Sequence, residues 1–171
     1  MRSFLSFVLF YLAANVSHCQ DLSVLAVHRC GSRIIVETKL TNTSRSISIE
    51  TPLSQEYEYG HALGSATLQY QVAAQRWVNI QRGTDQHSAG SRYLEPGEAI
   101  DDIIVADMSP DIESKVAGLK LRVSLTLAPK GSGKYRLLYT QLFTVDEKTL
   151  PDASAWFKKS VTEMCSGSGN L

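Results

Sequence analysis

The densest group of residues that could do chemistry lies at positions 55–61, where acidic, aromatic and imidazole side chains follow one another. The segment reads Gln55-Glu56-Tyr57-Glu58-Tyr59-Gly60-His61. In an extended chain alternate side chains share a face, so the two glutamates fall together and the histidine can turn toward them after the glycine. Two carboxylates and an imidazole could hold a divalent metal. A solvated loop explains the same composition, and we predict no metal site.

The tyrosines of this segment suggest a different chemistry. Tyr57 and Tyr59 fall on the face opposite the glutamates, and an exposed tyrosine offers a partner both an apolar ring and a polar tip. A second long connection, at residues 83–92, carries His87. The sequence therefore predicts a binding surface for a protein partner that includes Tyr57, Tyr59, His61 and His87.

Catalytic groupings are absent from the sequence pattern. Nucleophilic catalysis needs a base beside an exposed nucleophile, but the chain has no Gly-x-Ser-x-Gly segment, and His28, His61 and His87 fall in unrelated segments. The glycine-rich segment at 131–134 is followed by a strand pattern rather than a helix, which indicates a hairpin turn and not a phosphate-binding loop. We predict no catalytic residue and no cofactor.

The acid-rich stretch at 101–113 is predicted to be solvated surface. It lacks the alternating oxygen ligands and the glycine turn of a calcium loop. Asp101 and Asp102 are adjacent, so on a strand their side chains would point apart, and Ser109-Pro110 suggests a turn.

The first nineteen residues are typical of a secretory signal. Arg2 precedes an almost unbroken apolar run over 4–14, which is too short to span a bilayer. Cleavage after Cys19 would leave Gln20 first. Cleavage after Ala14 or Ser17 is one alternative, and would leave three cysteines with one unpaired. Lipidation of Cys19 is another, although His18 stands where a lipoprotein signal has a small residue. We expect a secreted or periplasmic protein without a transmembrane segment.

Two cysteines would remain after that cleavage, Cys30 and Cys165. An oxidising compartment favours an even number of cysteines in pairs. The sequence therefore predicts a disulfide between them, which would tie the end of the chain to its first hairpin. Two separate buried thiols are the alternative.

The elements that position these residues are predicted to be strands. Apolar side chains recur at every second position, as on a strand with one buried face. The clearest alternations cover 34–40, 66–72 and 119–127, and weaker ones cover 23–28, 47–50, 76–80, 100–106 and 135–145. Glu37 and Lys39 are expected to face outward. Turn residues separate the runs and no crossover helix lies between them, which favours an antiparallel sandwich or barrel of seven or eight strands.

The tail is the exception to the strand pattern. Pro151 ends the preceding strand, and Asp152 is placed to cap a helix that runs through about Cys165. Phe157, Val161 and Met164 would form its apolar stripe. The predicted organisation is a signal peptide at 1–19, a sandwich at 20–148, and a C-terminal helix with a frayed tail at 149–171.

Two turns resemble a known group of domains. Asn42-Thr43-Ser44 follows one strand, and Leu94-Glu95-Pro96-Gly97-Glu98 opens another, as in bacterial extracytoplasmic immunoglobulin-like domains. The resemblance implies a single immunoglobulin-like β-sandwich over about 22–146. The chain lacks the cysteine pair around a central Trp that antibody-type domains have, but Trp77 is still a candidate core residue. The first turn also matches a glycosylation acceptor, although a turn explains it as well.

Composition narrows the function further. The chain is 43% hydrophobic and has no net charge, which excludes disorder and argues against a nucleic-acid partner. We predict a non-catalytic binding protein, such as an envelope chaperone, inhibitor or assembly subunit. The alternatives are a hydrolase that combines His61 or His87 with distant acids, and a carrier of a small apolar ligand.

Overall fold

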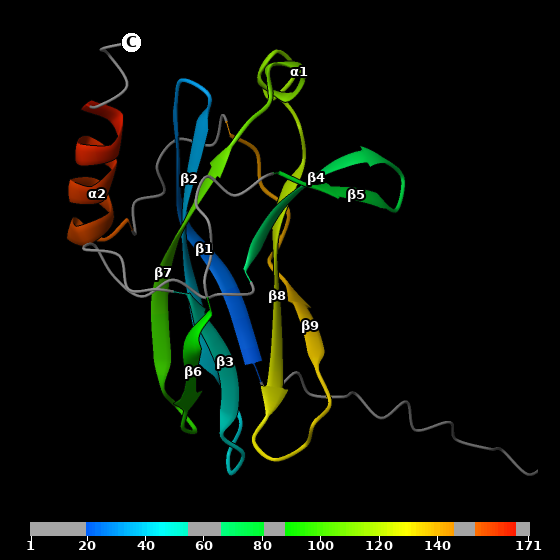
Figure 1. Cartoon of the computed structure of the whole chain (residues 1–171), viewed down its shortest axis with the longest axis vertical. Helices are drawn as coiled ribbons and strands as arrows, with labels where there is room; N and C mark the ends of the chain where they lie inside the picture. Colours follow the sequence, from blue (N-terminus) through cyan, green and yellow to red (C-terminus); the bar gives the residue numbers. More distant parts are fainter. Residues whose placement is uncertain (1–19, 55–65, 81–87, 146–152, 167–171) are drawn as a thin grey trace, which may run out of the picture.

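Two antiparallel sheets form the body of the protein in the computed structural model, which describes residues 20–54, 66–80, 88–145 and 153–166 (Figure 1). The smaller sheet has the order β1-β2-β7, and its strands are β1 (Gln20–Cys30), β2 (Arg33–Asn42) and β7 (Ala99–Asp107). The larger sheet has the order β5-β4-β8-β3-β6, with β9 paired to β8 beside this path. Its strands are β3 (Ile49–Ser54), β4 (Thr67–Ala73), β5 (Arg76–Asn79), β6 (Ser88–Leu94), β8 (Leu121–Pro129) and β9 (Arg136–Tyr139).

The core lies between the sheets and is built by strand alternation. Strand β2 contributes Ile34, Val36 and Leu40, all fully buried. Strand β8 contributes every second residue to the same cluster, and these are Leu121, Val123, Leu125 and Leu127. The alternating runs seen in the sequence are therefore inward-facing sets, and the predicted mainly β fold with a C-terminal helix is confirmed.

Strand β6 is a difference from the prediction. Residues 88–92 were expected to belong to a long connection, but they pair antiparallel with β3 from Ile49↔Leu94 to Ser54↔Ser88. The segment Ser88-Ala89-Gly90-Ser91-Arg92 has little apolar content and no alternation. Its strand conformation depends on backbone pairing with β3, which the side-chain pattern does not report. The described residues thus contain nine strands.

The acid-rich stretch is only partly surface. Asp101 and Asp102 point apart, as predicted, but Asp102 is fully buried and its strand partner is Thr38 of β2, which is also buried. The expectation of solvated surface is therefore wrong at Asp102. Beyond β7, the predicted turn at Ser109-Pro110 continues into the one-turn helix α1 (Pro110–Glu113).

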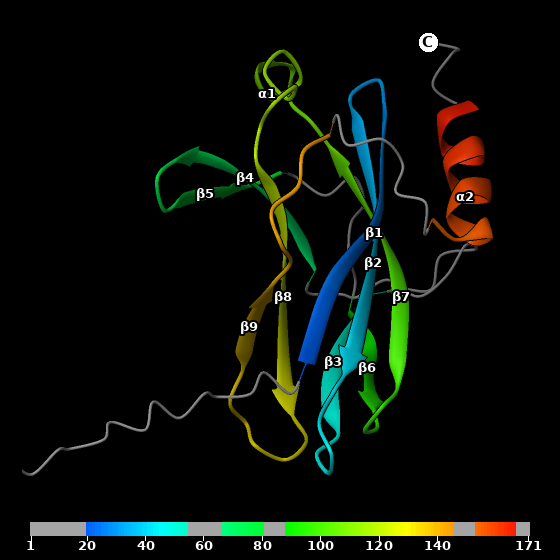
Figure 2. The same cartoon turned by 180° about the vertical axis from the view of Figure 1, so that it is seen from behind.

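Helix α2 (Ala155–Ser166) covers the outer face of the smaller sheet (Figures 1 and 2). Phe157 and Ala153 pack against Ala26, Ile35 and Ile103, which form a second apolar cluster. This face was expected to be solvated at Glu37, but Glu37 is fully buried. The reason is tertiary, because the residues that cover it lie more than a hundred positions later in the sequence.

The start of α2 also differs from the prediction. Ser154, not Asp152, caps the helix, since the Phe157 N–H donates to Ser154 Oγ at 2.9 Å. The Ser154 N–H in turn donates to Glu37 Oε2 at 3.1 Å. Asp152 lies outside the described residues. The buried carboxylate of Glu37 thus accepts a hydrogen bond that joins the start of the helix to the middle of β2.

A disulfide holds the other end of this helix. Cys30 at the end of β1 is bonded to Cys165 in the last turn of α2, with 5.7 Å between the Cα atoms. The predicted pairing is confirmed. Together with the Glu37–Ser154 hydrogen bond, it fixes α2 to the smaller sheet at both ends.

Asn42 joins the two turns that carry the family resemblance. Its side-chain amide donates to Ile47 O and Leu94 O, both at 2.9 Å, and its Oδ1 accepts the Ser44 N–H at 3.1 Å. Its backbone bonds Glu98 and Gly97 of the second turn. Gly97 has φ +85°, a conformation that favours glycine. Asn42 is fully buried, and its amide stabilises both turns through these hydrogen bonds.

Removing the disulfide should destabilise the fold strongly. For a sequence separation of 135 residues, loop-closure entropy sets an upper value of about 5 kcal/mol, and measured losses for small secreted domains are about 2–5 kcal/mol. We expect the double variant Cys30→Ser/Cys165→Ser to unfold at lower urea concentration than the oxidised wild type. Reduced wild type is the matched control and should unfold with the double variant. An unchanged urea midpoint would contradict the pairing.

Asn42→Ala should also destabilise the protein, by about 2–4 kcal/mol, because it leaves the buried backbone groups of Leu94 and Ser44 and the part-buried carbonyl of Ile47 without their side-chain partner. The control is Ser46→Ala, where the side chain is exposed and little change is expected. Urea unfolding of both variants measures the difference. Equal stability of the two would show that Asn42 does not join the turns.

Candidate functional site

The binding residues predicted from the sequence do not fall in the described part of the chain. Tyr57, Tyr59, His61 and His87 all lie outside the described residues, so this binding surface stays a prediction. The predicted connection at 83–92 is shortened by β6, which begins at Ser88. In the described residues, the candidate site lies instead on the outer face of the larger sheet.

Strand register places seven side chains on this outer face. The cross-strand pairs are Gln71↔Trp77, Gln69↔Asn79, Gln69↔Arg122 and Ser124↔Tyr139. Because paired residues share a face of the sheet, and because Leu121 and Val123 point to the core, Arg122 and its neighbours must point outward. Trp77 therefore belongs to the outer face, and the expectation that it is a core residue is wrong.

Arg122 is the centre of this face. Its guanidinium carbon lies 4.0 Å from the centre of the Trp77 ring and 3.9 Å from the centre of the Tyr139 ring. Its Nε donates to Gln69 Oε1 at 2.9 Å, and Gln69 Nε2 donates to Asn79 Oδ1 at 2.8 Å. We call these five residues the Arg122 cluster. Four strands supply them, and the two stacked rings and the hydrogen bond hold the cation in one orientation.

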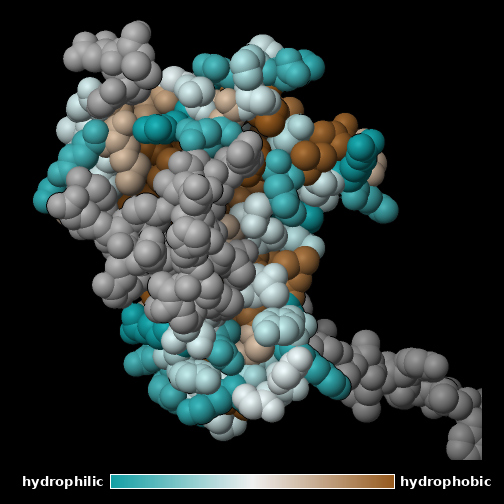
Figure 3. All heavy atoms as spheres, in the orientation of Figure 1, coloured by the Kyte–Doolittle hydropathy of each residue, from teal (hydrophilic) through white to brown (hydrophobic). Residues whose placement is uncertain are grey.

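An apolar stripe continues from the cluster along β9. Tyr135, Leu137 and Tyr139 occupy alternate positions and are 74%, 52% and 45% exposed, whereas Leu138 between them packs toward the core. We call Tyr135, Leu137 and Tyr139 the β9 stripe. Figure 3 shows further apolar side chains at the surface beside the β4–β5 hairpin, where Val72 is 44% exposed. Single exposed apolar residues are ordinary, but three at alternate positions beside a stacked arginine form one exposed apolar patch.

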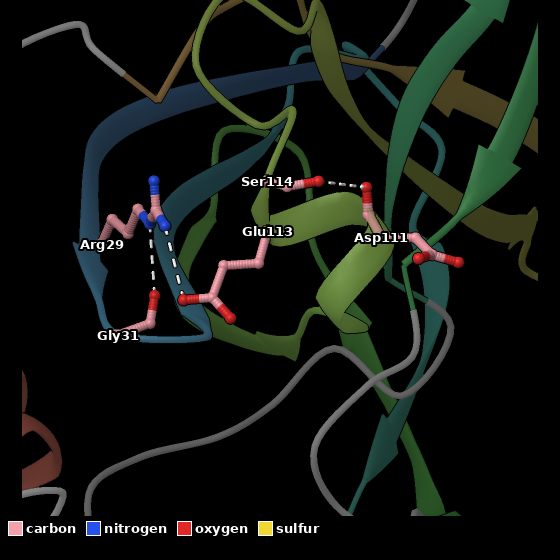
Figure 4. A network of polar contacts seen from close by, with 5 residues as sticks. All are labelled: Arg29, Gly31, Asp111, Glu113 and Ser114. Atoms are coloured by element: carbon pink, nitrogen blue, oxygen red, sulfur yellow. Dashed lines mark hydrogen bonds and ion pairs between the residues drawn. The ribbon is translucent and has the colours of Figure 1, made fainter.

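The charges of the chain are segregated along its length. Residues 94–114 contain seven acids and no Lys or Arg, whereas residues 115–145 contain six bases and no acid. Part of the acidic segment is neutralised locally, since Glu113 pairs with Arg29 at 3.5 Å and Asp107 pairs with Arg33 at 3.0 Å. Figure 4 shows Arg29 of the first hairpin and Glu113 of α1 pointing toward each other.

The basic segment is arranged differently. Lys130, Lys134 and Arg136 surround the turn between β8 and β9, and none of them takes part in the ion pairs among described residues. Lys130 lies over the Tyr93 ring at 4.8 Å. The predicted hairpin turn at 131–134 is confirmed, because β8 and β9 pair on either side of it. The β8–β9 hairpin is therefore a cationic surface next to the β9 stripe.

Part of this site could be predicted from the sequence. Alternation over 135–139 indicates an outward set of Tyr135, Leu137 and Tyr139, and the acid-free run is visible by inspection. The approach of Trp77 to Arg122 is not visible, because it needs β4 to pair with both β5 and β8. Within the described residues, no group of three His, Cys, Asp or Glu side chains is placed to hold a metal ion.

Comparisons with known proteins identify no family. No protein-family model and no curated protein matches the chain. A solved structure that matches is that of Spo0M, a sporulation control protein from Bacillus subtilis, with 12% identity and a TM-score of 0.37. The match covers 85% of this chain and 54% of that one, so the chain spans about half the length of that protein. The resemblance to extracytoplasmic immunoglobulin-like domains stays a prediction.

The stacking of Arg122 should be measurable as an energetic coupling. In a double-mutant cycle, Arg122→Ala and Tyr139→Leu should be less destabilising together than the sum of the single changes, by about 0.5–1 kcal/mol. Urea unfolding provides the four free energies. The control cycle combines Arg122→Ala with Tyr93→Leu, since the Tyr93 ring lies under Lys130 instead, and it should be additive. Additivity in both cycles would rule out the stack.

Proposed function

We propose that this protein is a non-catalytic binding protein of an extracytoplasmic compartment, and that a protein partner contacts the outer face of its larger sheet. The observation that carries the proposal is the juxtaposition of the Arg122 cluster with the β9 stripe. Trp, Tyr and Arg are the residues that most often contribute a large share of binding energy at protein interfaces.

Preorganisation supports the choice of this face. Binding costs conformational entropy whenever long side chains must be ordered, and arginine is among the more costly. Here Arg122 is already held by Trp77, Tyr139 and Gln69. A partner that contacts Arg122 therefore causes little further loss of side-chain entropy, because the arginine is already held in one orientation.

The compartment is supported by two observations. The Cys30–Cys165 disulfide suits an oxidising environment, and the sequence begins with a pattern typical of a secretory signal. No helix in the described part of the chain is long and apolar enough to cross a membrane. From the disulfide and the signal pattern we propose a secreted or periplasmic location. The predicted loop residues Tyr57, Tyr59, His61 and His87 are a second candidate surface for the same function.

Site-specific photo-crosslinking in the native host tests this proposal. A photoreactive amino acid at Leu137 should crosslink one discrete partner, whereas the same amino acid at Lys159, which is 74% exposed on α2, should not. Combining the Leu137 probe with Arg122→Ala should reduce the crosslinked product, since the cluster loses its cation. A product of equal yield at both positions, or one unaffected by Arg122→Ala, would overturn the assignment of this face.

A further inference from the structure

Strand β9 forms a border of the larger sheet. Among the described residues it pairs with β8 alone, through four consecutive antiparallel positions from Ser124↔Tyr139 to Leu127↔Arg136. Figures 1 and 2 both place it at the margin of the molecule. A strand in this position has one row of backbone groups that its own sheet does not use.

The identity of those backbone groups follows from the hydrogen-bond alternation. The Thr140 N–H donates to Val123 O at 3.0 Å, and the Val123 N–H donates back to Thr140 Oγ1 at 2.9 Å. Thr140 is therefore directed toward β8. In an antiparallel pair every second residue has this direction, so Leu138 and Arg136 share it. The N–H and C=O groups of Leu137 and Tyr139 are directed away from β8.

This edge lacks two of the devices by which proteins protect a border strand. Residues 135–139 contain no proline, and the β8–β9 register has no bulge. The two residues with outward backbone groups, Leu137 and Tyr139, also carry exposed side chains of the β9 stripe. An added strand would therefore find hydrogen-bonding groups and apolar contacts at the same two positions.

The charges around the edge select the occupant. Lys134 and Arg136 lie beside β9 without an acidic partner among the described residues, whereas the Lys130 ammonium is directed away from it, over the Tyr93 ring of β6. A second copy of β9 would bring like charges opposite one another, which is unfavourable. A strand that carries acidic side chains would instead place opposite charges next to Lys134 and Arg136. The cationic hairpin therefore disfavours self-association and favours an acidic strand.

We propose that the partner of this protein supplies an extended acidic segment, which adds to the larger sheet as a strand on the free edge of β9. The inference rests on the proposed binding function and deepens it by naming the chemistry of the partner. The backbone of Leu137 and Tyr139 provides the hydrogen bonds, and the β9 stripe contacts alternate side chains of the added strand. The basic residues of the hairpin favour glutamate or aspartate at the remaining positions.

A binding titration with short labelled peptides tests the proposal on the oxidised, mature protein. The probe is a peptide of alternating glutamate and valine, and the comparator replaces glutamate with lysine. Fluorescence anisotropy should detect binding of the glutamate peptide and much weaker binding of the lysine peptide. Added salt should weaken the interaction, because exposed charges contribute to it. Equal binding of the two peptides would overturn the charge selection.

The edge itself is tested by a matched pair of variants. Leu137→Pro removes an N–H that β8 does not use, so the fold should tolerate it while the added strand loses its hydrogen bond and its close approach. Leu137→Ala keeps the N–H and removes only the side chain. We expect Leu137→Pro to weaken binding at least roughly tenfold and Leu137→Ala to weaken it less.

A change in the peptide checks the same edge without altering the protein. Backbone N-methylation of the glutamate–valine peptide removes its own donors and should weaken binding to the wild type as Leu137→Pro does. If neither change weakens binding, strand addition is wrong. If crosslinking at Leu137 still depends on Arg122 in that case, the proposed function stands without it, and loss of that dependence would remove the proposed function as well.

Discussion

The alternation of β8 is the constraint on which the rest of the structure depends. Its inward residues are fully buried and form the centre of the core between the sheets. The same alternation forces Arg122 to the outer face, where strands on both sides of β8 place aromatic rings against it. Strand β9 pairs only with β8 among the described residues. The core and the Arg122 cluster are thus consequences of the alternation of one strand, and the free edge belongs to the strand that pairs with it.

The two outer faces of the sandwich differ in what covers them. Helix α2 covers the smaller sheet, and it is fixed there by the Cys30–Cys165 disulfide and by the Glu37–Ser154 hydrogen bond. The described part of the larger sheet instead presents aromatic and amide side chains at its surface. A face closed by a covalent bond is a stabilising element, whereas a face that keeps exposed rings in fixed positions is suited to recognition.

Net charge conceals the electrostatic character of this protein. The chain is neutral overall, yet all the charged residues of 94–114 are acidic and all those of 115–145 are basic. Two ion pairs to the first hairpin offset part of the acidic segment, whereas the β8–β9 hairpin keeps its cations next to an apolar stripe. A local field of this kind contributes more to the choice of partner than to affinity. It also opposes edge-to-edge association of identical chains, a common hazard of exposed strands.

The sequence by itself determined the mainly β fold, most strands and the C-terminal helix, because alternation and turn residues are local signals. It also determined the disulfide, because only one cysteine pair remains after the predicted cleavage. It did not determine β6, the burial of Glu37 and Asp102, or the position of Trp77. Each of these depends on contacts between residues distant in sequence: pairing with β3, cover by α2, enclosure between the sheets, and the stack on Arg122. Periodicity indicates on which face of a strand a residue lies, but only the tertiary structure decides whether that face contacts solvent, a helix or another sheet.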